Sequence, residues 1–477
     1  MLGTDYSYQI QGQDASAALA EFSRREHART VVVPTDDNKV KARLRELEEP
    51  IILFGEGPAD RRDRLRYLLS IGNGDTRMTD SNDNGDDEAE EEEYYTAGSE
   101  DLLLARRKIA SHSLPRARDR IARQKQESQV PLSRLIAHRK AQNARLRTLV
   151  SQGSQIAADR PVSIARFSPD SRTIATGSWA GDLRFFDAST LEERRRVTGH
   201  VDKVSGLSWH PHATTGLPPS VCNVVTGGGE GDVCLWALTG DAPLATMKGH
   251  GGRVARVEFH PSGHFIGSAS FDGTWRLWDV ETTAELLLQQ GHSHEVYAIS
   301  FQDDGALVAT AGLDAIGRVW DLRSGRTVMV LDGHMKAIQG LGFSGNGYQL
   351  ATGSADDTVK IWDLRQVRNV ATIPAHKSLV SDVRFFHGGY AGRQDNDEEM
   401  VDGDATSRHK VNGDSTYLAT SGYDGAVNIW SADDWTLVKS LVGPAEKKVM
   451  SVDISRDNQQ ICSSGFDRTL RLWSGDV

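Results

Sequence analysis

The chain has 477 residues, a formal net charge of −11 and three cysteines. This length suits more than one core or one large repeat fold. No run of about 18 apolar residues and no basic-then-apolar leader occurs, so neither a membrane span nor a secretory signal is expected. Cys222, Cys234 and Cys462 form no CxxC pair and no even framework, which favours small core residues in a reducing compartment, the cytosol or the nucleus.

Charge is distributed in blocks along the first third of the chain. Residues 76–100 hold ten acids and one base and contribute −9, whereas residues 101–150 hold thirteen Lys or Arg against three acids and contribute +10. Adjacent blocks of opposite sign suit a chain that works in a charged assembly. Two solvated surfaces explain the same blocks, and the sequence leaves both interpretations open.

The first 75 residues divide into two parts. Residues 1–30 show no periodic pattern and are expected to be disordered. Residues 31–75 predict two short helices with an apolar joint at 51–54. The second helix begins at Gly57-Pro58, because proline suits the first position of a helix.

The turn before the second helix is not predicted to be a phosphate-binding loop. It lacks the GxxxxGK[ST] spacing, and Glu56 would repel a phosphate. The arginines after it are expected on the outer face of the helix, where contact with RNA phosphates or plain solvation would explain them. The residues themselves leave two interpretations open, an RNA-binding helix and a clip for another protein. The candidate contact residues are Phe54, Arg61, Arg62, Arg64, Leu65 and Leu68.

Residues 76–100 are predicted to be an acidic tether, and residues 101–150 a basic helical segment. Its leucines and isoleucines recur on helices too isolated to be stable alone. We therefore expect this segment to fold on a partner.

A repeat governs the remainder of the chain. The units end at regularly spaced aromatic residues, three of the intervals being 42 residues long: Phe186, Trp236, Trp278, Trp320, Trp362, Trp430 and Trp473. Gly-His pairs precede the middle units, and in three of them the histidine lies 28 residues before the tryptophan. This spacing is typical of WD repeats, in which each unit builds a four-stranded propeller blade.

Within each unit, a histidine, a hydroxyl residue, a turn aspartate and the tryptophan are predicted to form a hydrogen-bonded chain that satisfies every buried polar group. A set that recurs in successive blades is expected to be structural rather than catalytic or metal-binding. The three regular tetrads are His250, Ser268, Asp272 and Trp278; His292, Thr310, Asp314 and Trp320; and His334, Thr352, Asp356 and Trp362.

The predicted fold is all-β, a seven-bladed propeller over residues 151–477. The chain stops four residues after Trp473, so the last blade lacks a strand, and residues 151–158 are the predicted donor. Residues 387–414 hold seven acids and three bases and are predicted to be an acidic loop insertion.

One face of the propeller is predicted to bind a partner. The residue before each turn aspartate points to this face, and several of these residues are aromatic, with cations beside them. Aromatic anchors among positive charges suit an acidic protein segment or RNA, although some of the rings are equally suited to packing between blades. The predicted rim is Trp179, Lys203, Arg253, Phe271, Tyr297, Tyr423, Lys448 and Phe466.

The stretch VPTDDNKVKARLRELEEPIILFGEGPADRRDRLRYLLS, from Val33 to Ser70, resembles the splicing-factor motif of the pre-mRNA-processing factor 4 family. These are WD-repeat proteins of the U4/U6 small nuclear ribonucleoprotein. ARRKIASHSLPRARDRI and ATGSADDTVKIWDLRQ extend the resemblance to nearly the whole chain. Gly443-Pro444, where Gly-His is usual, and the 387–414 insertion depart from the family pattern.

The resemblance implies a nuclear, non-catalytic scaffold that needs no cofactor. It also favours the stretch around Gly57-Pro58 as an N-terminal clip for another protein, with contact to RNA as the second interpretation. It implies pre-mRNA-processing factor 3, other tri-snRNP proteins and U4/U6 RNA as partners, and a cyclophilin-H-type isomerase where one exists. The alternative is a substrate receptor of a ubiquitin ligase or another interaction hub, although no F-box-like helical cluster occurs in residues 1–150. An enzyme is the third class, and no convergent pair of acids or metal set supports it.

Overall fold

The computed structural model describes parts of residues 33–69, residues 98–388 and, apart from position 433 and residues 444–446, residues 415–475. The predictions for residues 1–30, the 76–97 part of the tether, Phe54 and nearly all of the 387–414 insertion lie outside these residues. The chain divides into two compact units, residues 1–92 and 93–477.

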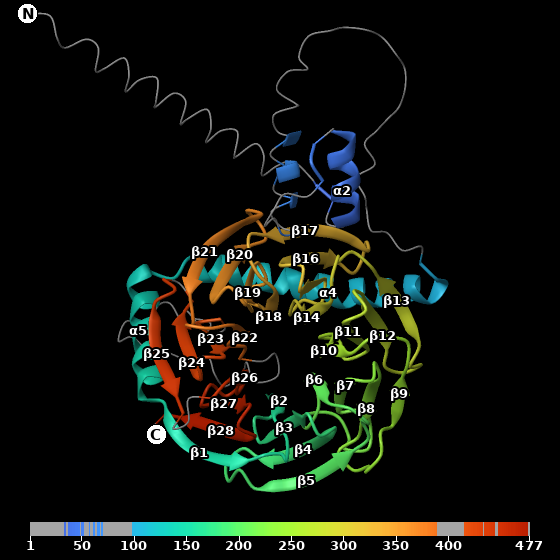
Figure 1. Cartoon of the computed structure of the whole chain (residues 1–477). Helices are drawn as coiled ribbons and strands as arrows, with labels where there is room; N and C mark the ends of the chain where they lie inside the picture. The colour runs from blue at the N-terminus through green and yellow to red at the C-terminus, as the bar shows by residue number, and fades with distance from the viewer. Residues whose placement is uncertain are drawn as a thin grey trace, which may run out of the picture. The chain divides into compact units, whose positions relative to one another are not determined.

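The second unit is a ring of four-stranded antiparallel sheets (Figure 1), and seven such sheets are found in the described residues. This confirms the predicted seven-bladed propeller. The strands are β1 (Val150–Ile156), β2 (Val162–Phe167), β3 (Thr173–Ser178), β4 (Asp182–Asp187), β5 (Glu193–Thr198), β6 (Val204–Trp209), β7 (Val224–Gly228), β8 (Val233–Trp236), β9 (Ala245–Met247), β10 (Val254–Phe259), β11 (Phe265–Ser270), β12 (Trp275–Asp279), β13 (Glu285–Gln289), β14 (Val296–Phe301), β15 (Leu307–Gly312), β16 (Ile316–Asp321), β17 (Arg326–Asp332), β18 (Ile338–Phe343), β19 (Gln349–Ser354), β20 (Thr358–Asp363), β21 (Arg368–Pro374), β22 (Val380–Phe385), β23 (Tyr417–Gly422), β24 (Ala426–Ser431), β25 (Leu437–Val442), β26 (Val449–Ile454), β27 (Gln460–Gly465) and β28 (Thr469–Ser474).

The ring is closed by a strand that comes before the first blade. β1 pairs antiparallel with β28, in register from Val150 opposite Ser474 to Ile156 opposite Thr469, with one irregularity between Ser151 and Gly153. The last sheet therefore has the order β1-β28-β27-β26. An edge that β28 would leave open is thus covered by β1, which precedes the first blade in the same chain.

Each blade is pinned at the turn between its second and third strands by a residue in the left-handed region of backbone space. The residue after the turn acid has φ of +79° at Gly273 and +85° at Gly425. Ala315, Asp357 and Arg468 hold the same place with φ of +61° to +70°, a conformation that glycine adopts at less cost. The turn geometry is thus kept even where the sequence departs from glycine.

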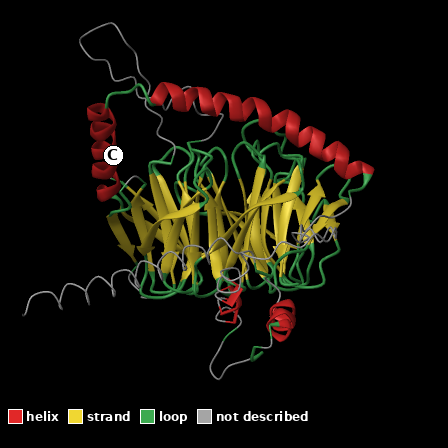
Figure 2. Cartoon of the chain, turned by 90° about the horizontal axis from the view of Figure 1, so that it is seen from above, coloured by secondary structure: helices red, strands yellow, loops and turns green. Residues whose placement is uncertain are grey.

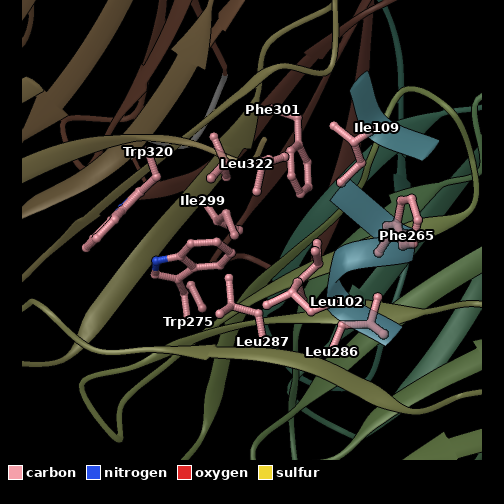
Figure 3. Close-up of a cluster of buried hydrophobic side chains, with 14 of the residues drawn as sticks. Leu102, Ile109, Phe265, Trp275, Leu286, Leu287, Ile299, Phe301, Trp320 and Leu322 are labelled. Atoms are coloured by element: carbon pink, nitrogen blue, oxygen red, sulfur yellow. The ribbon is translucent and has the colours of Figure 1, made fainter. Parts of the chain in front are cut away.

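A long helix, α4 (Glu100–Glu127), lies across the loops on one side of the ring (Figure 2). Ser99 caps its first turn by accepting a hydrogen bond from the Leu102 amide at 3.2 Å. Leu102 and Ile109 are buried in one cluster with Phe265 and Phe301 of the propeller (Figure 3). The helix therefore contributes side chains to the propeller core.

Polar contacts continue this docking along α4. Arg120 Nε is 2.7 Å from a carboxylate oxygen of Asp304, and Gln124 donates to the Asn346 carbonyl at 2.7 Å. Arg116 donates to the Asp303 carbonyl at 3.2 Å. These acceptors lie in loops that join the first and second strands of neighbouring blades, so α4 bridges blades.

A second helix, α5 (Leu132–Thr148), joins α4 to the closing strand and packs against the outer strand β25. Leu146 and Leu149 are buried with Trp473, and Lys439 Nζ donates to the Arg147 carbonyl at 2.6 Å. The propeller of the same chain therefore covers part of the apolar surface of residues 101–150, which corrects in part the expectation that this segment folds on a separate partner. Other apolar side chains stay 46–70% exposed: Leu103, Ile121, Leu132 and Ile136.

The first unit contains α2 (Asp37–Glu46) and helical residues between 61 and 69. Val40, Leu44 and Leu65 are buried together, with Leu68 and Leu69 packed against them. Among the described residues, no helix combines the length and apolar composition that a membrane crossing needs.

The arginines of this unit correct a prediction. Arg61 and Arg62 are only 5% and 7% exposed, so they do not lie on an outer, solvated face. Arg64 donates to the Pro50 carbonyl at 2.7 Å. Long arginine side chains can be buried when the guanidinium finds acceptors nearby, and the helical period alone does not show where those acceptors are.

The packing of α4 on the propeller predicts that alanine substitutions on this helix lower the free energy of unfolding by unequal amounts. Replacing Ile109, which is fully buried, by alanine is expected to lower the free energy of unfolding by about 2–5 kcal/mol, since it leaves a cavity in the core. Leu114 is 57% exposed on the same helix, and L114A is expected to change stability by less than about 0.5 kcal/mol. Urea denaturation of both variants checks this, and equal effects would show that α4 does not pack as described.

Candidate protein-binding surface

The members of each regular tetrad are joined by hydrogen bonds. In the blade of β10–β13, His250 Nδ1 lies 2.8 Å from Asp272 and its Nε2 lies 2.7 Å from Ser268 Oγ, which accepts from the Trp278 indole at 2.8 Å. The next two tetrads repeat this at 2.7–2.9 Å. Two further blades contain hydrogen-bonded sets of the same kind. One set links His200, Thr226 and Trp236, and the other links His376, Thr420 and Trp430.

The tetrad carboxylates are held ionised. Burial alone would raise the pKa of Asp272, Asp314, Asp356 and Asp424, but the hydrogen bond and charge of the facing histidine outweigh it. The pKa of each therefore lies below its ordinary value. Because every polar atom of these sets is engaged within its own blade, the sets rigidify the loops of the ring rather than meet a substrate.

The predicted rim residues come together in three groups on the face opposite α4. They lie at the turns between second and third strands and at or just before the starts of first strands, whereas α4 contacts loops at the other strand ends. The first group joins Trp179 and Phe466, whose rings meet edge to face at 5.6 Å, with Lys203 Nζ 5.7 Å from the Trp179 ring centre. This group spans the seam between the last and first blades.

The other two groups pair rings with cations in the same way. The ring centres of Phe271 and Tyr297 lie 6.0 Å apart, and the Arg253 guanidinium is 5.2 Å from the Phe271 ring centre. Lys448 Nζ is 4.9 Å from the ring centre of Tyr423. Burial, then the neighbouring Tyr297, raise the pKa of Tyr423 to about 12, so its hydroxyl stays protonated at neutral pH.

Exposure divides the rim. Phe466 is 44% exposed and Lys448 is also exposed, whereas the other six residues are half-buried. The rings thus serve both interpretations left open by the sequence: they pack on neighbouring blades and keep part of their surface accessible. Cation–π contacts within the rim hold the positive groups close to the aromatic ones.

Two apolar residues on this face were missed. Val201 and Met335 are 95% and 86% exposed, and each directly follows a tetrad histidine. The corresponding residues in other blades are Gly251, Ser293 and Lys377. An apolar residue at an otherwise small or polar loop position was the available signal.

A buried charge cluster inside the ring was also missed. Arg166, Arg256 and Arg384 approach the single carboxylate of Asp382 at 2.8, 3.4 and 4.0 Å. Its signal was a charged residue on strands that otherwise read as core. Within the described ranges, no group of three or more His, Cys, Asp or Glu side chains is arranged to hold a metal ion.

Comparison with known families agrees with this geometry. The model for the WD domain, G-beta repeat, matches residues 150–187, 191–237, 241–279, 284–321, 325–363, 407–431 and 435–474. The chain belongs to the WD-repeat family. A second model, described as pre-mRNA processing factor 4 (PRP4) like, matches residues 40–68 of this WD-repeat protein.

The chain is also similar to curated proteins. The U4/U6 small nuclear ribonucleoprotein Prp4 of Homo sapiens is 43% identical over 205 residues, covering 42% of this chain and 39% of the relative. The Saccharomyces cerevisiae U4/U6 small nuclear ribonucleoprotein PRP4 is 34% identical over 262 residues, covering 51% of this chain and 53% of the relative. An uncharacterized WD repeat-containing protein of Schizosaccharomyces pombe is 43% identical over 262 residues, covering 54% and 56%.

These alignments cover about half of each relative or less. Together with the match at residues 40–68, they confirm the predicted resemblance to the pre-mRNA-processing factor 4 family.

The tetrads predict that the propeller loses conformational stability at acidic pH. A carboxyl whose pKa is lowered on folding contributes stability that is complete above its unfolded pKa, about 3.9, and is lost as pH falls through the folded value. We expect the urea midpoint to fall steeply below about pH 4. The D314A variant loses one such contribution, so its acid slope should be shallower than that of D241A, in which the replaced carboxylate is 94% exposed. Equal slopes would contradict this account.

Proposed function

We propose that this protein is a non-catalytic scaffold of the U4/U6 and U4/U6.U5 small nuclear ribonucleoproteins, acting in the nucleus in pre-mRNA splicing. The observation that carries the proposal is the combination of a PRP4-like segment at residues 40–68 with a seven-bladed WD-repeat propeller. Two relatives, 43% and 34% identical to this chain over the aligned residues, are named U4/U6 small nuclear ribonucleoproteins.

The proposed mechanism is bridging. The first unit has a core of its own, formed by Val40, Leu44 and Leu65, and the propeller offers the rim as a second, separate surface. Two binding modules on one chain convert the second binding event into an intramolecular one, which raises its effective concentration. The proposed partners are pre-mRNA-processing factor 3, other tri-snRNP proteins, a cyclophilin-H-type isomerase where present, and the U4/U6 RNA duplex.

The rim suits such a role because it combines aromatic rings with cations. Aromatic residues and arginine concentrate the free energy of binding at protein interfaces. The cations beside the rings favour an acidic protein segment or the phosphates of RNA. The histidines and aspartates, in contrast, are engaged in the tetrads, which supports a binding rather than a catalytic role.

The proposal predicts which RNAs accompany the protein. Immunoprecipitates of the tagged protein from nuclear extract are expected to contain U4 and U6 RNA in near-equal amounts. The L65D variant, which places a charge in the core of the first unit, is expected to lose both RNAs while its propeller still unfolds cooperatively. The matched control L47S changes a leucine that is 40% exposed in the same unit and should retain them.

Recovery of neither RNA with the unchanged protein would contradict the scaffold proposal. Retention of a protein substrate by L65D without either RNA would favour a ubiquitin-ligase receptor, whose substrate-binding face lies on the propeller.

A second prediction concerns the rim. The double variant F466A/K448A removes the two exposed members of the predicted rim and is expected to lower recovery of the same RNAs at least about ten-fold, as loss of about 1.4 kcal/mol of binding free energy would do. V328A, on the outer strand β17 and 55% exposed, is the control and should bind normally. If F466A/K448A binds like V328A, the rim is not the interface.

A further inference from the structure

The centre of the ring holds a polar cavity on the side covered by α4. It encloses about 280 Å³, and its lining includes Arg116 from α4 and Arg166, Arg384 and Arg456 from the propeller. Glu258, Asp303 and Asp453 line the same space. The cavity is thus large enough for a small molecule and rich in guanidinium groups.

Positive charge exceeds negative charge around this cavity. Among the described residues, Arg166, Arg256 and Arg384 share Asp382 as their one ion-pair partner within 4.0 Å. Burial alone would raise the pKa of Asp382, but the three arginines lower it to about 2. One carboxylate therefore faces three guanidinium groups, and buried charges left unbalanced in this way are costly.

Some hydrogen-bond donors in the cavity wall have no acceptor in the described residues. The Nε groups of Arg166 and Arg384 are buried and have no hydrogen-bond partner. Arg166 is only 5% exposed. In the described part of the chain, the Arg456 guanidinium takes part in no hydrogen bond or ion pair within 4 Å, and burial lowers its pKa. Buried donors of this kind ordinarily find an acceptor.

The remaining acids leave an excess of one positive charge, because four arginines and three acids line the cavity. Burial raises the pKa of Glu258 and of Asp453, and neither carboxylate lies within ion-pair distance of an arginine in the described residues. One oxygen of Asp453 instead accepts from the Phe167 amide at 2.8 Å. Asp303 lies 3.1 Å from His387.

We propose that this cavity binds a compact oxyanion, inorganic phosphate or the phosphoryl group of a small phosphomonoester, between Arg384, Arg456 and Arg116. Guanidinium groups bind phosphate oxygens through paired, charge-assisted hydrogen bonds. The position of Arg116 on α4 means that the helix forms part of the site, so an occupied site would tie α4 to the ring. This proposal is independent of the role in splicing.

The test is calorimetric titration of the purified full chain with inorganic phosphate, with glycerol phosphate and with citrate at matched ionic strength. We expect saturable one-to-one binding of phosphate or of the phosphomonoester. The compound that binds more tightly shows whether the site takes free phosphate or a phosphomonoester. R456Q and R116Q are expected to weaken binding at least about ten-fold. R194Q, which alters an arginine 54% exposed on the outer strand β5, is the control and should bind like the unchanged protein.

Cooperative thermal unfolding verifies that each variant is folded, and R116Q changes no propeller residue. Absence of saturable binding would overturn the proposal and leave a cavity balanced by its own acids. Equal binding by R456Q, R116Q and R194Q would overturn it as well, since the anion would then sit elsewhere. Tighter binding of citrate than of either phosphate compound would contradict the phosphoryl assignment.

Discussion

The pairing of β1 with β28 is the contact on which the rest of the molecule depends. A propeller whose last blade lacked its outer strand would expose an open sheet edge and two unjoined ends of the ring. The inner strands add to the closure, because the Ala165 and Phe167 amides of β2 donate to Ser451 and Asp453 of β26 at 2.9 and 2.8 Å. Closure through both the outer and inner strands fixes the first and last blades against each other.

Closure also explains why α4 and α5 lie where they do. Because β1 must reach β28, the residues directly before β1 are held at the ring, and part of their apolar surface is covered there. The helices in turn bury Leu102, Ile109 and Leu146 in the propeller core. The rim lies on the opposite face of the propeller, and the tetrads beneath it keep its loops in place.

Much of this could be predicted from the sequence, since the signals are local and repeated. The recurring interval before Trp278, Trp320 and Trp362 predicts the blades, and the hydroxyl and acid at fixed positions predict the tetrads. Arg61 and Arg62 were placed wrongly on an outer face, because a helical period gives the side of a helix and not what covers it.

The cluster around Asp382 was missed because its members lie on three different blades. Only the closed ring brings Arg166, Arg256 and Arg384 to one carboxylate. The same limit applies to the rim: the sequence indicates which residues face that side, but their grouping across the seam at Trp179 and Phe466 depends on the ring's geometry.

The central claim is that one chain holds different neighbours with its first unit and with its propeller rim. Chemical cross-linking with mass spectrometry on the purified U4/U6 particle tests it most directly. The account predicts cross-links from Lys41 to one protein and from Lys203 and Lys448 to another, in the same particle. Cross-links of all three lysines to a single neighbour, or to none of the splicing proteins, would contradict it.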